Sequence, residues 1–151
     1  MRCVNTIMKH CTNLKAAGGL LLWGVGITMA FNLQAADPKL DISKLPPPAK
    51  KKDVSFNTDV KAIYDKSCAK CHSGEKAKGD LRLDTREGVL KGGESGPVVV
   101  AGKSDKSNLV FYIADLVPDM EMPPLPKRRE VPALTKEQVG LIRAWIDQGA
   151  K

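Results

Sequence analysis

The chain has 151 residues, a length typical of one domain rather than several. Its 24 basic and 17 acidic residues give a formal net charge of +7. The sequence has neither zinc-finger spacing nor a basic patch interleaved with aromatic residues, so we expect no nucleic-acid partner.

The first 35 residues have the pattern of a secretory signal peptide. Three basic residues and no acidic residue precede the apolar stretch 16–33, and the small residues Ala35 and Ala36 end it. We expect cleavage after Ala35 (after Ala36 as the alternative) and an exported, periplasmic protein. The other interpretation is an N-terminal membrane anchor. The apolar stretch is marginal for the ~20 residues of a spanning helix, and its four glycines and Asn32 weaken that interpretation.

The segment after the signal differs in composition from the rest. Residues 36–53 contain Pro46-Pro47-Pro48 and Lys50-Lys51-Lys52, which predict a disordered or extended, solvated linker. The rest of the chain, 54–151, is expected to form one small domain. Because residues 1–35 hold three of the 24 basic residues and none of the 17 acidic ones, cleavage would lower the net charge from +7 to +4.

Helical periodicity predicts two helices in the first part of this domain. Residues 57–67 repeat apolar side chains at positions i, i+3 and i+4. Residues 105–116 do the same, and Ser104 is expected to cap their N-terminus. Between residues 79 and 103 the glycines are frequent and the helical period is absent, which predicts loops and turns.

The last helix has the clearest predicted start. Thr135 and Gln138 are spaced as a capping box, and Leu134 and Val139 as a hydrophobic staple. Apolar residues then continue at helical spacing, and Gly149 suits the position just after the helix end. We therefore expect a helix from Thr135 to about Gly149.

The pentapeptide Cys68-Ala69-Lys70-Cys71-His72 directly follows the first predicted helix. Two thiols three positions apart, followed at once by an imidazole, form the attachment site for c-type haem. Cys68 and Cys71 would form thioethers to the haem, and His72 would be the proximal iron ligand. The motif occurs once, so we expect one covalently bound haem c. A zinc site and a thiol–disulfide oxidoreductase are the weaker interpretations, because a fourth ligand and a preceding strand are both missing.

Elimination narrows the distal iron ligand. If residues 1–35 are removed, His72 is the single remaining histidine, which excludes bis-histidine ligation. Met120 and Met122 then remain, together with lysine, a weak ligand or an open site. Because proline restricts the residue before it and so stiffens the loop, Met122 is favoured as the ligand and Met120 is second. The alternative is that both methionines pack in the core.

A longer set of motifs extends over residues 56–150. Its members are Val60 and Ile63, the pentapeptide 68–72, Gly79-Asp80-Leu81-Arg82-Leu83-Asp84, Lys91-Gly92-Gly93-Glu94-Ser95-Gly96-Pro97, Ala101-Gly102-Lys103, Ser107-Asn108-Leu109, Met122-Pro123-Pro124, Leu134-Thr135-Lys136-Glu137-Gln138 and Trp145-Ile146-Asp147-Gln148-Gly149-Ala150. With these motifs the chain resembles the planctomycete-type cytochrome c domain of the class I c-type cytochrome superfamily. Two features depart from that pattern: Ala101 stands where the family often has proline, and residues 125–133 form a longer and more basic insertion.

The resemblance implies an all-α, cytochrome c-like fold whose first and last helices cross. It also implies that His72 is the proximal ligand and that the methionine before Pro123 is the distal one. In class I cytochromes a Gly-Pro segment supplies a carbonyl to the proximal histidine ring, and Gly96-Pro97 is the candidate here, with a simple turn as an equal alternative.

These features favour a periplasmic monohaem electron carrier without enzymatic activity. The alternative is a haem enzyme, or the electron-transfer subunit of a periplasmic dehydrogenase or peroxidase. Partners are expected to be redox proteins with acidic surfaces. Electrostatic attraction would steer such a partner toward Lys66, Lys70, Lys76 and Lys78. The plainer interpretation is that each lysine is only part of a solvated surface. A membrane is expected as a partner only if the signal segment is uncleaved.

Overall fold

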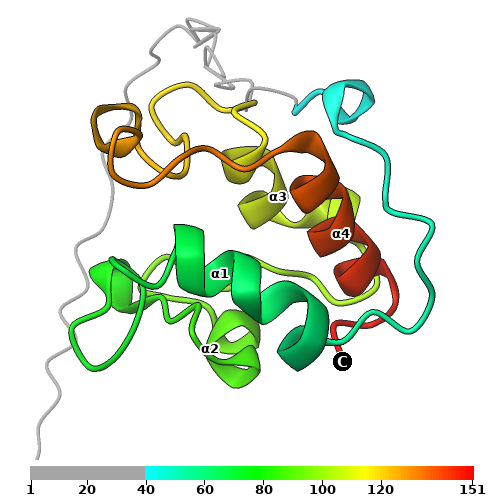
Figure 1. Cartoon of the computed structure of the whole chain (residues 1–151), viewed down its shortest axis with the longest axis horizontal. Helices are drawn as coiled ribbons and strands as arrows, with labels where there is room; N and C mark the ends of the chain where they lie inside the picture. Colours follow the sequence, from blue (N-terminus) through cyan, green and yellow to red (C-terminus); the bar gives the residue numbers. More distant parts are fainter. Residues whose placement is uncertain (1–39) are drawn as a thin grey trace, which may run out of the picture. The chain divides into compact units, whose positions relative to one another are not determined.

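A computed structural model describes residues 40–151, so the predictions for residues 1–35 and for 36–39 lie outside the described part of the chain. Residues 40–151 form helices and turns and contain no β-strand, which confirms the predicted helical class (Figure 1). None of the helices in this part is long and apolar enough to span a membrane. The elements in chain order are η1 Ile42–Lys44, η2 Phe56–Val60, α1 Lys61–Ser67, η3 Lys78–Asp80, α2 Arg86–Lys91, η4 Ser104–Lys106, α3 Asn108–Ile113, η5 Leu125–Lys127 and α4 Lys136–Asp147.

The first and last helical segments pack together through three buried aromatic rings. Element η2 runs directly into α1, so Phe56 and Tyr64 belong to one continuous helical segment. Trp145 of α4 lies against both rings, with centroid separations of 5.6 Å from Phe56 and 6.5 Å from Tyr64. The edge-on geometry of the Tyr64–Trp145 pair is one that aromatic quadrupoles favour. This interface holds α1 in position, and therefore also the pentapeptide 68–72 that follows it.

The start of α4 is as the sequence predicts. The Thr135 hydroxyl accepts the backbone N–H of Gln138 at 3.2 Å, and the Gln138 side chain accepts the N–H of Thr135 at 2.9 Å. Both bonds of the capping box are therefore present. Gly149, which has φ +93°, lies just beyond the C-cap residue Gln148. A left-handed residue at this position is the usual end of a helix, and glycine adopts it without a steric cost.

The prediction for the middle helix is too long at both ends. The α-helix begins at Asn108 rather than at residue 105 and ends at Ile113 rather than at residue 116, and Ser104 does not cap it. Instead, Ser104 donates its backbone N–H and its hydroxyl to the Asp147 carboxylate of α4, at 2.8 and 3.0 Å. A partner distant in sequence therefore replaces the local one.

The structure also contains a helix that the sequence interpretation missed. Element α2, Arg86–Lys91, lies within the segment expected to be loops. Its N-cap is Thr85, whose hydroxyl accepts the N–H of Gly88 at 3.2 Å. Six residues are too few to produce a visible period, and the surrounding glycines hid the cap signal.

The described part of the predicted linker, residues 40–53, is mostly exposed, as expected for a solvated segment. This segment, hereafter the leader, also packs along α4, which the sequence did not predict. Leu45 is buried in the core, and the Ala49 N–H donates to the Gly140 carbonyl at 2.9 Å. The Arg143 guanidinium donates to the carbonyl of Pro46. The prolines preset an extended backbone, so little ordering entropy opposes this packing.

Gly140 provides the space for this contact. A Cβ atom at position 140 would lie 2.7 Å from the Pro47 carbonyl oxygen, closer than atoms pack without displacement. We therefore expect Gly140→Ala to lower the free energy of unfolding by about 1–2 kcal/mol, although alanine is the better helix former. Chemical denaturation measures the change. Lys136→Ala, on the exposed surface of the same helix, is the control and should shift stability by less than about 0.5 kcal/mol. An unchanged or more stable Gly140→Ala variant would contradict the packing of the leader.

Candidate haem-binding site

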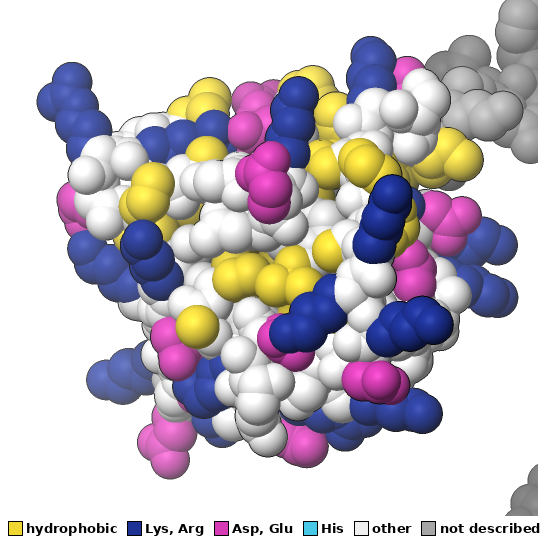
Figure 2. Space-filling view, turned by 45° about the vertical axis from the view of Figure 1, so that its right-hand side comes forward, with side chains coloured by type: hydrophobic (Ala, Val, Ile, Leu, Met, Phe, Trp, Pro, Cys, Tyr) yellow, Lys and Arg dark blue, Asp and Glu magenta, His cyan; other side chains and the backbone are white. Residues whose placement is uncertain are grey.

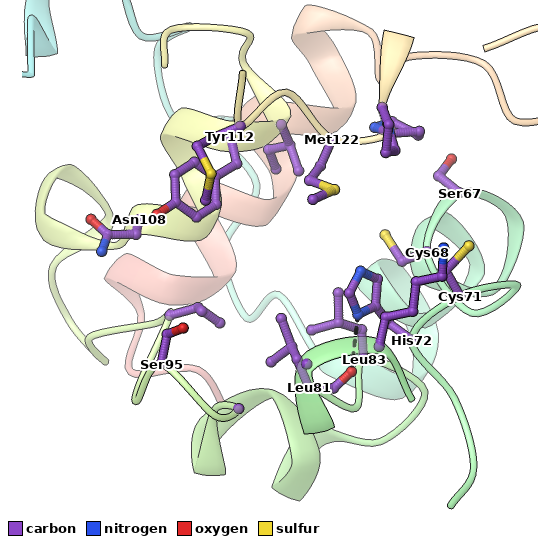
Figure 3. Close-up of a pocket in the computed structure, with 18 of the residues that line it drawn as sticks. Ser67, Cys68, Cys71, His72, Leu81, Leu83, Ser95, Asn108, Tyr112 and Met122 are labelled. Atoms are coloured by element: carbon purple, nitrogen blue, oxygen red, sulfur yellow. Dashed lines mark hydrogen bonds between the residues drawn. The ribbon is translucent and has the colours of Figure 1, made fainter. Parts of the chain in front are cut away.

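A cavity of about 250 Å³ lies between the end of α1 and the loop that follows α3 (Figure 3). Its wall is mostly apolar, with contributions from Leu81, Leu83, Val98 and Ile113. All six site residues proposed from the sequence line this one cavity: Cys68, Cys71, His72, Pro97, Met120 and Met122. Segments separated by up to 54 positions in the sequence therefore converge on one place.

The end of α1 brings the two thiols and the imidazole to the same wall. The chain continues in tight turns after Ser67, because the Cys68 N–H donates to the Tyr64 carbonyl at 2.8 Å and the His72 N–H donates to the Cys68 carbonyl at 2.9 Å. Figure 3 shows both sulfur atoms beside the His72 ring. A porphyrin linked to both thiols would therefore lie next to the imidazole.

The thiol of Cys68 is protonated at neutral pH. Burial raises its pKa to about 12, because desolvation disfavours the thiolate. Thiol–disulfide oxidoreductases use a cysteine whose pKa is lowered, so that the thiolate can attack a disulfide. The environment of Cys68 has the opposite effect and disfavours that interpretation of the CxxC spacing.

The ring of His72 has a defined tautomer. Its Nδ1 lies 3.1 Å from the carbonyl oxygen of Leu81 (Figure 3). A carbonyl oxygen can only accept, so Nδ1 carries a proton, and in the neutral ring the lone pair is then on Nε2. The Leu83 N–H donates to the His72 carbonyl at 2.8 Å and holds the segment 81–83 against the histidine. The imidazole is thus oriented for Nε2 to bind a metal.

This arrangement changes the role expected for Gly96-Pro97. Pro97 lines the cavity, but the carbonyl that accepts from His72 belongs to Leu81. The sequence could not identify Leu81, because every residue has a backbone carbonyl and the type of side chain does not show which carbonyl accepts a hydrogen bond.

The two methionines differ in their surroundings. Met122 packs against the hydrophobic core, and its N–H donates to the Tyr112 carbonyl of α3 at 2.9 Å. Met120 also lines the cavity, but 43% of its surface is exposed. Figure 3 shows Met122 and His72 reaching the cavity from opposite sides. The geometry therefore favours Met122 as the side chain that faces the imidazole.

These residues fit a covalently bound haem. The donor set comprises two thiols for thioether bonds, an imidazole with its Nε2 lone pair available and a thioether sulfur facing it. The apolar wall suits the porphyrin ring, and Lys70, Lys78 and Lys127 are exposed while also contributing to the lining, which places charge at the rim.

Residues 68–126 match the family model described as Planctomycete cytochrome C. This match supports a planctomycete-type cytochrome c domain in the chain. A domain of this family indicates haem-based electron transfer and implies a covalently bound haem c. No curated protein and no solved structure matches the chain.

The cytochrome c domain also uses residues that the sequence interpretation did not assign to the site. Lys127 and Val131 line the cavity from the insertion 125–133, and Tyr112 and Asn108 line it from α3. The basic insertion was noted as a departure from the family pattern, but nothing in its composition indicated that it folds back over the cavity. Of the four lysines proposed to steer a partner, Lys70 and Lys78 line the cavity.

Replacing both thiols should abolish covalent haem attachment. In the double variant Cys68→Ser/Cys71→Ser the serine hydroxyls cannot form thioethers, so the denatured polypeptide should carry no haem when the chain is made in a host able to mature c-type cytochromes. Intact mass and haem staining after denaturing electrophoresis measure the result. Ser67→Ala, in the adjacent residue, is the control and should retain the haem. Haem that remains attached in the double variant would refute the assignment.

Proposed function

We propose that the protein is an exported, periplasmic carrier of single electrons that holds one haem c, with His72 and Met122 as the axial ligands. One observation carries this proposal: the Met122 side chain and the His72 ring reach one cavity from opposite sides, and both thiols line the same cavity. The decisive experiment is purification from a maturation-competent host. A haemochrome spectrum of c-type and a mass raised by one haem would support the proposal, whereas a colourless protein of unmodified mass would end it.

Each residue in this proposal has a distinct task. When bound, haem supplies one-electron exchange between its ferric and ferrous forms. The Leu81 carbonyl accepts the Nδ1 proton of His72 and so orients the ring with Nε2 available as a ligand. The apolar side chains of the wall, such as Leu83, exclude water. Cys68 and Cys71 keep the group attached in either oxidation state.

Ligation by Met122 would favour a carrier over an enzyme. A thioether raises the reduction potential relative to a second imidazole, and a filled coordination sphere suppresses reactions at the iron. Peroxidase chemistry would instead need an open distal side with a polar acid–base group. Among the cavity-lining residues of the described chain there is no arginine and no histidine other than His72.

The proposed haem number and location rest on the sequence. The CxxCH motif occurs once in 151 residues, which supports a single haem. Residues 1–35 have the composition of an export signal, and bacteria attach haem c on the outer side of the cytoplasmic membrane. The two features support a periplasmic location independently of each other.

Substitution of the two methionines should separate their roles. Met122→Ala should lose the ferric absorption band of an iron–thioether bond and let the ferrous protein bind carbon monoxide, because the distal position opens. Met120→Ala should keep the band and exclude carbon monoxide, since Met120 is 43% exposed and Met122 would remain as the ligand. Absorption spectra of both variants in both oxidation states measure this. The opposite pattern would assign the iron to Met120.

Acidic redox proteins are the proposed partners. Lys70, Lys78 and Lys127 lie at the cavity rim, where a partner would approach the redox centre. Glu130 pairs with Lys70 at 2.5 Å and approaches Lys127 at 4.0 Å, so it offsets part of the positive charge of the rim. The face drawn in Figure 2 mixes both signs of charge. Steering would therefore depend on the lysines of the rim rather than on the overall charge.

Removing one rim charge should slow electron transfer to an acidic partner. Lys78→Gln should lower the second-order rate several-fold at low ionic strength and by much less at high salt, because steering acts through screened electrostatics. Lys91→Gln is the matched control, since Lys91 is exposed on α2 and does not line the cavity. Stopped-flow kinetics over a range of salt concentrations measure both. Equal rates for the two variants would remove the proposed steering.

A further inference from the structure

The loop that carries Met122 is held at two consecutive residues. The Met122 N–H donates to the Tyr112 carbonyl at 2.9 Å. The carbonyl of Pro123, a buried residue, accepts a hydrogen bond from Nε of Arg128 at 3.0 Å. A backbone segment with partners on both sides of one side chain leaves that side chain few alternative positions.

Arg128 reaches this loop from the insertion 125–133, beyond the segment 68–126 that matches the family model. Its two terminal nitrogens donate to both carboxylate oxygens of Asp115, at 2.8 and 2.5 Å. This is the two-pronged geometry that a planar guanidinium makes with a carboxylate, and a lysine ammonium cannot reproduce it. The guanidinium is therefore fixed in orientation while Nε points to Pro123.

The hydrogen bond of Met122 and the ion pair of Arg128 both reach the C-terminal end of α3. Tyr112 lies in the last turn of α3, and Asp115 follows two residues after its last residue, Ile113. Arg128 thus closes a ring of contacts that runs from α3 through Met122 and Pro123 and returns through Asp115. Movement of the Met122 loop away from the cavity would break the bond from Arg128.

The Arg128–Asp115 ion pair is better suited to hold the Met122 loop than the second ion pair of the insertion, Lys70–Glu130. Its side chains are 23% and 39% exposed, so solvent screens it only in part. The Lys70–Glu130 pair, which joins the same insertion to the pentapeptide 68–72, is 59% and 53% exposed, and pairs at such exposure contribute little.

We propose that Arg128 is the positioning residue for the distal ligand: through the Pro123 carbonyl, and anchored on Asp115, it holds the Met122 sulfur toward the iron. This inference rests on the proposed function, in which Met122 is that ligand. Arg128 itself does not touch the redox centre. Its effect is to raise the population of the conformation in which the sulfur is bound.

Competition by imidazole tests the proposal on the intact haem protein. Imidazole binds ferric iron only when the distal sulfur leaves, so its apparent Kd reports how firmly Met122 is held. Arg128→Ala should lower this Kd roughly tenfold, as the loss of one hydrogen bond to a charged group would give. Arg128→Lys should lower the Kd by nearly the same factor, because lysine keeps the charge but cannot make the two parallel hydrogen bonds of the guanidinium.

Three control variants separate positioning from general effects. Arg129→Ala removes the same charge from the next, exposed residue and should leave the Kd unchanged. Asp115→Asn should lower the Kd less than Arg128→Ala does, and it serves if the alanine variant is unstable. Met122→Ala should bind imidazole tightly, and adding Arg128→Ala in that background should have no further effect, because no sulfur remains to be positioned.

The outcomes distinguish this inference from the proposed function. If Met122→Ala leaves both the thioether band and the imidazole Kd unchanged, Met122 is not the ligand and the proposed function fails at that point. If Met122→Ala opens the site but Arg128→Ala and Asp115→Asn behave like Arg129→Ala, ligation stands and the positioning role is overturned. An Arg128→Ala effect that persists unchanged in the Met122→Ala background would also overturn it.

Discussion

The imidazole of His72 donates its Nδ1 proton to the Leu81 carbonyl, and the use of the other cavity residues depends on this bond. The opposite tautomer would carry its proton on Nε2, and the ring would then offer no lone pair there to a metal. A free ring would rotate and lose its alignment with the thiols. Because the bond partner is backbone, tied in turn to His72 through Leu83, the orientation survives changes in the side chains around it.

Different parts of the chain carry chemistry and stability. The matched segment 68–126 contains both thiols, the imidazole and the two methionines. The aromatic interface that fixes the end of α1 is built from Phe56, Tyr64 and Trp145, all outside that segment. The segment 68–126 therefore depends on flanking elements for its rigidity, although it contains all of these groups, near its two ends.

The sequence predicted those features whose determinants are local. The pentapeptide 68–72 and the capping box at Thr135 are short patterns with a direct physical cause, and the structure contains the capping box as expected. The prediction failed where a residue distant in the sequence is the partner: Ser104 bonds Asp147 instead of capping its own helix. The sequence left two interpretations of Gly96-Pro97 open and gave no sign that the carbonyl beside His72 is that of Leu81. No periodicity or composition contains that information, because it arises only when separate segments come together.

The leader shows the same limit, and its packing sets a minimum length for the folded protein. Pro46 accepts from Arg143, Ala49 bonds the backbone of Gly140, and Leu45 is part of the core. An exopeptidase digesting from the N-terminus would therefore meet resistance well before the aromatic interface, near Leu45, since further trimming would expose apolar surface on α4. Protein digested in this way should accordingly accumulate with a heterogeneous N-terminus that does not extend past Leu45.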